Sequence, residues 1–126
     1  MKRNPALQPL SREHHTALVL AKACEHAAQS GDATMVNQVC RRAILAFANE
    51  LEPHFKIEEQ SFLPLLNSPA AHALAQRTIK DHEQLRGLLT GLQQDNAAAL
   101  GDFGKYLTAH VRFEERELFP VIESLL

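Results

Sequence analysis

The sequence has few cysteines, no long apolar run and no excess of positive charge, and each absence excludes a class of protein. Cys24 and Cys40 are the only two cysteines, and they form no Cys-x-x-Cys pair, which argues against a disulfide framework or a thiolate zinc site. No run of about 18 uncharged apolar residues occurs, and the first residues lack the apolar run of a signal peptide, so we expect a cytoplasmic protein without a membrane span. The net charge of −2 offers no basic surface for nucleic acid.

Apolar residues recur at steps of three and four along most of the chain, and no useful stretch alternates with period two. This pattern predicts four helices, over about 10–29, 34–64, 69–92 and 97–126, with Asp102 as an alternative start of the last. Ser11 could cap the first helix, Pro53 should kink the second without breaking it, and the prolines Pro64 and Pro120 are typical helix terminators. We expect one all-α domain, residues 1–126, folded as an antiparallel up-down-up-down four-helix bundle.

One motif occurs twice. The segment His54-Phe-Lys-Ile-Glu58-Glu59 returns as His110-Val-Arg-Phe-Glu114-Glu115, and each repeat is followed by apolar residues and a proline. Residues four apart lie on the same side of a helix, so each histidine points the same way as the first glutamate after it. An imidazole and a carboxylate that converge from one helical turn form half of a metal site.

Two of the other five histidines also share the expected interior. His82 lies on the apolar stripe that includes Ala75, Ile79 and Leu85, and His14 shares its helix face with Leu10 and Ala17. Its neighbour His15 faces mainly polar residues, so we assign His14 to the interior and keep His15 as the alternative. We expect His26 and His72 on the surface. Tyr106, one turn before His110, could point toward the site or pack in the core.

Each expected helix thus supplies one inward histidine, and each repeat adds a glutamate. The candidate metal ligands are His14, His54, Glu58, His82, His110 and Glu114. Imidazole and carboxylate without thiolate suit iron or manganese, and zinc also accepts them. Glu58 and Glu114 could bridge two ions, each held also by two histidines, with positions left open for a small ligand. Glu59 and Glu115 are rotated by about 140° from their histidines and should lie in solvent or support the ligands from outside, with Glu115 in place of Glu114 left open.

The motifs resemble those of the hemerythrin-like, or HHE cation-binding, family. The resemblance covers nearly the whole chain and rests on Ser-Arg-Glu-His14, His54-Phe-x-x-Glu58-Glu59, Asp81-His82-Glu83 and His110-x-x-x-Glu114-Glu115, with Phe62-Leu-Pro64 and Leu118-Phe-Pro120 after the two repeats. It implies a four-helix bundle with a non-haem iron centre, commonly two ions bridged by an oxo or hydroxo group, that meets O2, NO, peroxide or iron itself. The oxygen-carrying members have a further histidine four residues after the one matched by His82, where this chain has Arg86. This difference from the oxygen-carrying members favours sensing, iron handling or peroxide and NO chemistry, as implied by the wider family, over oxygen carriage.

Three functions remain distinct at this point. The leading one is a module that binds or senses a small molecule through two metal ions. The second is a di-iron oxidase or peroxidase, although the Glu-x-x-His motif of ferritin-like oxidases and the His-Glu-x-x-His motif of zinc proteases are both absent. The third is a metal-free helical interaction domain. Four buried histidines, one per helix, are costly in a core that binds nothing, which favours a metal protein.

Overall fold

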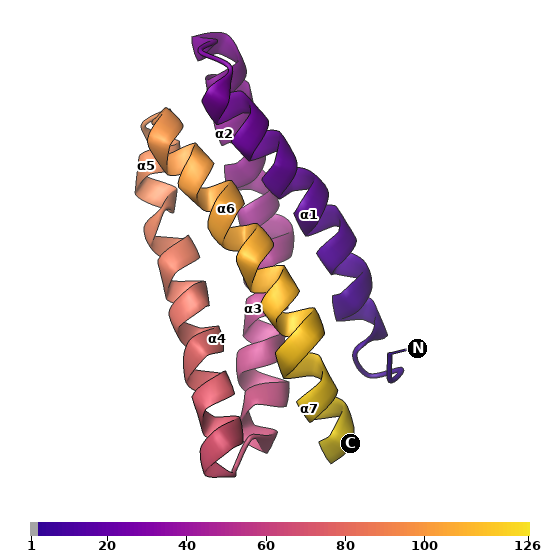
Figure 1. The fold of residues 1–126 in the computed structure, drawn as a ribbon. Coiled ribbons are helices and arrows are strands. Elements are labelled where there is room, and N and C mark those ends of the chain that lie inside the picture. The colour runs from indigo at the N-terminus through magenta and orange to yellow at the C-terminus, as the bar shows by residue number, and fades with distance from the viewer. Residues whose placement is uncertain (1–2) are drawn as a thin grey trace.

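The structure, a computed structural model, describes residues 3–126, and these contain helices and no strand (Figure 1). The chain forms four rods. The first is α1 (Gln8–Gln29). The second joins α2 (Ala33–Ala46), η1 (Phe47–Leu51), α3 (Glu52–Ile57), η2 (Glu58–Phe62) and η3 (Leu63–Leu65). The third joins α4 (Pro69–Gly87) and α5 (Leu89–Gln93), and the fourth joins α6 (Ala97–Phe113), η4 (Glu114–Leu118) and α7 (Phe119–Leu125). The rods run up, down, up and down, which confirms the all-α antiparallel bundle.

Local sequence explains where three of the rods begin. The side chains of Asp32, Ser68 and Asn96 accept hydrogen bonds from backbone amides in the first turns of α2, α4 and α6. Pro69 follows Ser68 as the first helical residue, as the sequence predicts. The expected cap at Ser11 is wrong, because α1 begins at Gln8 after Leu7 and has no side-chain cap. The Ser11 hydroxyl instead donates to Glu115.

Three five-residue π-helical turns each end just before a proline. Glu52, Leu63 and Phe119 donate their amide protons to carbonyls five residues back, and Pro53, Pro64 and Pro120 follow them. A proline lacks the amide that an α-helix needs, and the widened turn lets the chain continue past it. The second rod therefore passes Pro53 without a break, as predicted, and ends with a short 3-10 turn around Pro64. The prediction that Pro120 ends a helix is wrong, because α7 continues to Leu125.

The apolar interior consists of two clusters. The larger joins all four rods around Phe47, Phe55 and Phe103, and the smaller joins the opposite ends of the rods around Phe62 and Phe119. Two predicted interior positions are wrong, because Ile79 is 40% exposed and Tyr106 is 36% exposed. Neither residue therefore faces the core. The prediction failed because helix periodicity alone does not fix how wide the buried face is.

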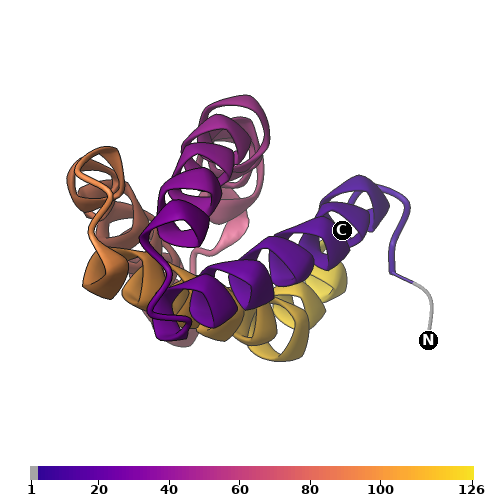
Figure 2. The same cartoon turned by 90° about the horizontal axis from the view of Figure 1, so that it is seen from above.

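The first and fourth rods are the closest pair, and α1 runs beside α6 in both views (Figures 1 and 2). Gly104 allows this approach, because a Cβ atom there would lie 2.6 Å from the Ala21 carbonyl oxygen. The α2–α3 rod diverges from this pair (Figure 2). None of the helices in residues 3–126 has the length and apolar character that a membrane crossing requires.

Candidate metal centre

A layer of polar side chains is buried among the apolar residues of the bundle. It contains all six predicted ligands, one histidine from each rod and one glutamate from each repeat, and each is at most 4% exposed: His14, His54, Glu58, His82, His110 and Glu114. The three remaining histidines, His15, His26 and His72, are exposed. The structure thus separates the seven histidines as the sequence analysis predicts, with His14 inside and His15 outside.

The six side chains form two overlapping groups of four. His14 and His54 complete one group and His82 and His110 the other, while Glu58 and Glu114 belong to both. In each group, one potential ligand atom from every residue lies within 4.8 Å of the others. This spacing suits a central cation that all four atoms could reach. Two such positions that share two carboxylates match the arrangement expected from the repeats.

The histidines direct Nε2 toward the glutamates of this layer. His14 Nε2 lies 2.8 Å from Glu114 Oε1, and His82 Nε2 lies 3.0 Å from Glu58 Oε1. The two histidines of the repeats lie slightly farther from their own glutamates, at 3.3 Å for His54 and Glu58 and 3.4 Å for His110 and Glu114. All four imidazoles therefore present the same nitrogen to the centre.

The opposite nitrogen of every imidazole meets a carboxylate from the preceding rod, so that these contacts close a ring around the bundle. Glu13 of the first rod lies 3.3 Å from His54 Nδ1, and Glu59 of the second lies 2.7 Å from His82 Nδ1. Asp81 of the third rod lies 2.9 Å from His110 Nδ1, and Glu115 of the fourth lies 2.6 Å from His14 Nδ1. A proton on each Nδ1 can donate to these carboxylates, which makes Nε2 the nitrogen available to a metal once it carries no proton.

This ring includes the second glutamate of each repeat. Glu59 and Glu115 are only partly buried and support histidines from outside the layer, as one of the two predicted placements has it. The sequence analysis missed the roles of Glu13 and Asp81. Each acid directly precedes an inward histidine in the chain, and this adjacency is the signal that could have identified them. Their partners are nevertheless histidines of the next rod, which only the fold brings near.

Two arginines form ion pairs with Glu59 and Glu115, the second glutamates of the two repeats. Arg86 forms hydrogen bonds to Glu52 at 2.6 Å and to Glu59 at 3.3 Å. Arg3 pairs with Glu115 at 3.3 Å and with Glu123 at 2.6 Å, and it also donates to the Glu115 backbone carbonyl. Arg86 therefore lies outside the layer as a partner of its supporting acids, and it does not replace a ligand.

Charge is distributed unequally within the layer. Burial alone would lower the pKa of His54 and His110, but the surrounding carboxylates outweigh it and raise both pKa values to about 10. These carboxylates are Glu58 and Glu114 for both histidines, together with Asp81 for His110. Burial and the neighbouring Glu114 raise the pKa of Glu58. Burial also opposes ionisation of Glu114, yet attraction to His110 and its hydrogen bonds hold its pKa well below the usual range.

Three atoms of the layer test whether a cation fits. Glu58 Oε2, His110 Nε2 and Glu114 Oε2 are buried and have no hydrogen-bond partner among residues 3–126. Buried polar atoms are nearly always satisfied in folded proteins, because each unpaired group costs free energy. All three belong to residues of the two groups of four that could hold a metal ion, whereas the two cysteines lie in the larger apolar cluster. The donors available are thus nitrogen and oxygen, and they fit a cation such as iron, manganese or zinc.

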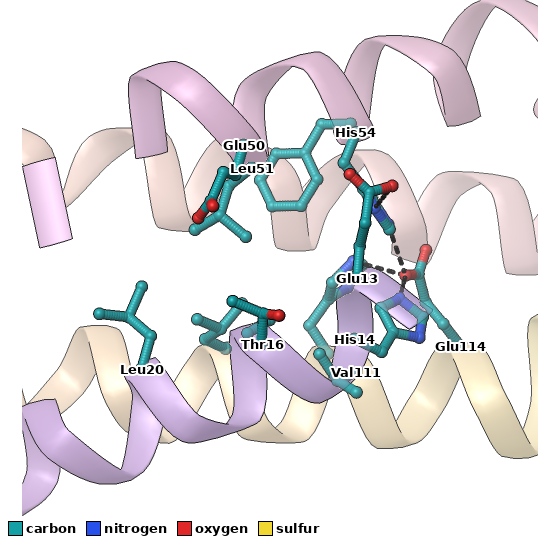
Figure 3. Close-up of a pocket in the computed structure, with 13 residues that line it drawn as sticks. Glu13, His14, Thr16, Leu20, Glu50, Leu51, His54, Val111 and Glu114 are labelled. Atoms are coloured by element: carbon teal, nitrogen blue, oxygen red, sulfur yellow. Dashed lines mark hydrogen bonds and ion pairs between the residues drawn. The ribbon is translucent and has the colours of Figure 1, made fainter. Parts of the chain in front are cut away.

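A cavity of about 70 Å³ adjoins the layer between α1, the η1–α3 segment and α6 (Figure 3). His14, His54, His110 and Glu114 form part of its wall, so the candidate ligands are accessible from it. Pockets for organic substrates typically measure about 300–1,000 Å³. A space of this size has room for roughly two water molecules.

The bundle and its buried histidine–glutamate layer define a helical protein with a candidate cation site. The model of the hemerythrin HHE cation-binding domain matches residues 6–122, nearly the whole chain, and the chain therefore belongs to this family of cation-binding proteins. No curated protein and no solved structure matches the chain in the corresponding searches.

Proposed function

We propose that the chain holds two iron ions in the buried layer and uses them to bind or sense a small molecule such as O2, NO or peroxide, or to handle iron. His14 and His54 would hold one ion, His82 and His110 the other, and Glu58 and Glu114 would serve both. The family match supports cation binding, and the two groups of four that share both glutamates support two positions. Manganese or zinc would be held by the same residues.

The observation that carries this proposal is the set of three buried ligand atoms without a hydrogen bond, Glu58 Oε2, His110 Nε2 and Glu114 Oε2. Each points into a layer where four imidazoles and two carboxylates meet. A bound cation would give these atoms a partner and offset the cost of burying them. A metal-free interaction domain has no need of unpaired polar atoms at its centre.

Iron bound by imidazole and carboxylate supplies open coordination positions and a change between two oxidation states. The residues of the chain would orient the ligands and supply negative charge for the bound iron. The carboxylates at Nδ1 fix the orientation of the rings, and Glu58 and Glu114 would compensate the positive charge of the ions in the buried layer. Because His54 and His110 have raised pKa values, their Nε2 protons must leave when a metal binds, and binding should release protons.

The cavity favours a small-molecule module over an oxidase for organic substrates. Its volume of about 70 Å³ is well below the roughly 300–1,000 Å³ of typical pockets for larger organic ligands. A diatomic molecule or peroxide would fit.

Metal analysis tests the proposal directly. Protein loaded anaerobically with Fe²⁺, desalted and analysed should contain about two iron ions per chain. His110→Ala should lose most of the bound iron, because it removes a buried ligand, while His72→Ala, an exposed histidine on α4, should retain it. Wild-type protein that stays free of iron, or equal iron contents in the two variants, would refute the assignment.

A further inference from the structure

The cavity beside the candidate ligands has an acidic outer end. Glu13 on α1 and Glu50 on η1 lie at its rim, and both are solvent-exposed, the Glu13 side chain by 48% (Figure 3). The same lining includes the buried residues His110 and Glu114, which are only 2% and 0% exposed and which have unpaired polar atoms. Any ligand that enters through this cavity therefore passes two carboxylates before it meets the unpaired inner atoms.

No lysine or arginine compensates this rim, and none lines the cavity. Within residues 3–126, neither Glu13 nor Glu50 forms an ion pair with lysine or arginine, and the only charged-group partner of Glu13 is His54. In the metal-loaded protein this imidazole would be a neutral ligand and would not cancel the charge of Glu13. A small anion at the rim would therefore be repelled by nearby charges of its own sign.

The walls of the cavity also disfavour the entry of ions. Their apolar part includes Leu20, Leu51, Phe55 and Val111. An ion that enters must give up hydration for apolar contacts, whereas an uncharged molecule loses little. Acidic rim and apolar walls together favour neutral ligands.

We propose that Glu13 and Glu50 make this cavity selective for uncharged molecules of diatomic size against small anions. The inference rests on the proposed function, because it concerns the ligand that reaches the metal layer. It assigns a role to two residues that are not candidate ligands. Glu13 thereby has two roles, since it also supports His54.

The test compares one anionic and one neutral probe on iron-loaded protein by stopped-flow absorption. Azide is the anion, applied to the ferric form, and NO is the neutral probe, applied anaerobically to the ferrous form. Glu50→Gln should accelerate azide association on the order of 3–10-fold and leave NO association unchanged. Glu13→Gln keeps a hydrogen-bond acceptor for His54, so its effect is read as the ratio of the azide and NO rates. Glu83→Gln, an exposed acid on α4 outside the cavity, is the matched control and should change neither rate.

Ionic strength provides an independent readout. Added salt should accelerate azide association with the wild type, because it screens the rim, and should have a smaller effect on the double variant Glu13→Gln/Glu50→Gln. Azide rates that are unchanged in Glu50→Gln, or that change in parallel with the NO rates, would overturn the proposal. These results are distinct from a failure of the proposed function, which would appear beforehand as protein without iron or without an NO spectrum.

The metal-free protein tests the cavity itself. Xenon is uncharged and suits small apolar cavities. It should shift the NMR signals of Leu20, Leu51 and Val111 in a saturable manner, equally in the wild type and in Glu50→Gln. Absence of saturable shifts at these residues would show that neutral molecules do not enter here and would overturn the inference.

Discussion

The two repeats have the same motif but different surroundings, and their comparison shows what the motif alone leaves open. His110 of the second repeat has a close, largely buried acid at Nδ1, Asp81 at 2.9 Å and 18% exposed. His54 of the first repeat has the half-exposed Glu13 at 3.3 Å and lies beside the acidic rim of the cavity. The second repeat is thus the more tightly held half, and the first is the half that faces the entrance.

The glutamates of the two repeats differ as well. Glu114 lies within 4 Å of three imidazoles, those of His14, His54 and His110, whereas Glu58 lies near His54 and His82 only. Glu114 accordingly has a lowered pKa and Glu58 a raised one. In the metal-free protein, Glu114 is the main negative charge of the layer.

The largest expected effect therefore comes from removing this charge. In metal-free protein at pH 7, Glu114→Gln should lower the free energy of unfolding by about 3–5 kcal/mol, because it leaves protonated imidazoles buried without their partner. Glu58→Gln should cost clearly less, since the pKa of Glu58 is already raised toward the neutral form. Urea unfolding measures both, with the exposed Glu117→Gln as control. Equal losses for Glu58 and Glu114 would contradict the asymmetry between the repeats.

The second effect is a dependence of stability on pH. The folded pKa values of His54 and His110 are about 10, above the ordinary 6.5, so the folded state holds protons that the unfolded chain has released. Stability from these histidines is complete below pH 6.5 and is lost as the pH rises toward 10. The raised pKa of Glu58 acts in the same direction. Metal-free protein should lose about 2–3 kcal/mol per pH unit in this window, because each of the two histidines contributes about 1.4 kcal/mol per unit.

The contribution of each repeat to this slope can be separated. His54→Gln and His110→Gln should each remove about half of it, as measured by urea unfolding across the pH range. Metal-loaded protein should lack the slope, because its imidazoles bind the ion without the Nε2 proton. A metal-free stability that stays level or rises between pH 7 and 10 would disprove the charge assignment.

A smaller effect concerns the outer carboxylates. Asp81→Asn should weaken metal affinity about 10–100-fold, the usual range for a hydrogen-bonded support of a ligating histidine. Glu13→Gln should weaken it only a few-fold, because its contact is longer and half-exposed. Competition with a chelator gives both affinities. A larger loss of metal affinity in Glu13→Gln than in Asp81→Asn would contradict the conclusion that the second repeat is the more tightly held half.

The smallest effect is expected at the arginines that hold the outer acids. Arg86→Lys keeps the charge but loses the forked contact to Glu52, and it should cost about 1 kcal/mol of stability. Arg3→Lys should cost a similar amount at the second repeat. Thermal unfolding of the two variants, with Arg112→Lys as an exposed control, compares them. Loss of iron in Arg86→Lys would mean that this arginine acts on the ligands themselves.

Helix type and order were predictable because they follow from local pattern. The helix start at Pro69, the inward side of His14 and the shared direction of His54 and Glu58 depend on residues within one or two turns. Predictions failed where the deciding contact was distant or the helix was irregular. Ser11 bonds to Glu115 and caps nothing, and the π turn before Pro120 lets the chain continue where an α-helix would stop.

The sequence by itself determined the all-helical bundle, the six candidate ligands and the duplication, because helix periodicity fixes which side chains point inward. Only the tertiary structure decided that Glu13 and Asp81 support histidines of neighbouring rods, that the supporting acids close a ring, and that a cavity with an acidic rim opens beside the first repeat. These features join residues from different helices. Their distances depend on how the rods pack, and no spacing along the chain encodes that directly.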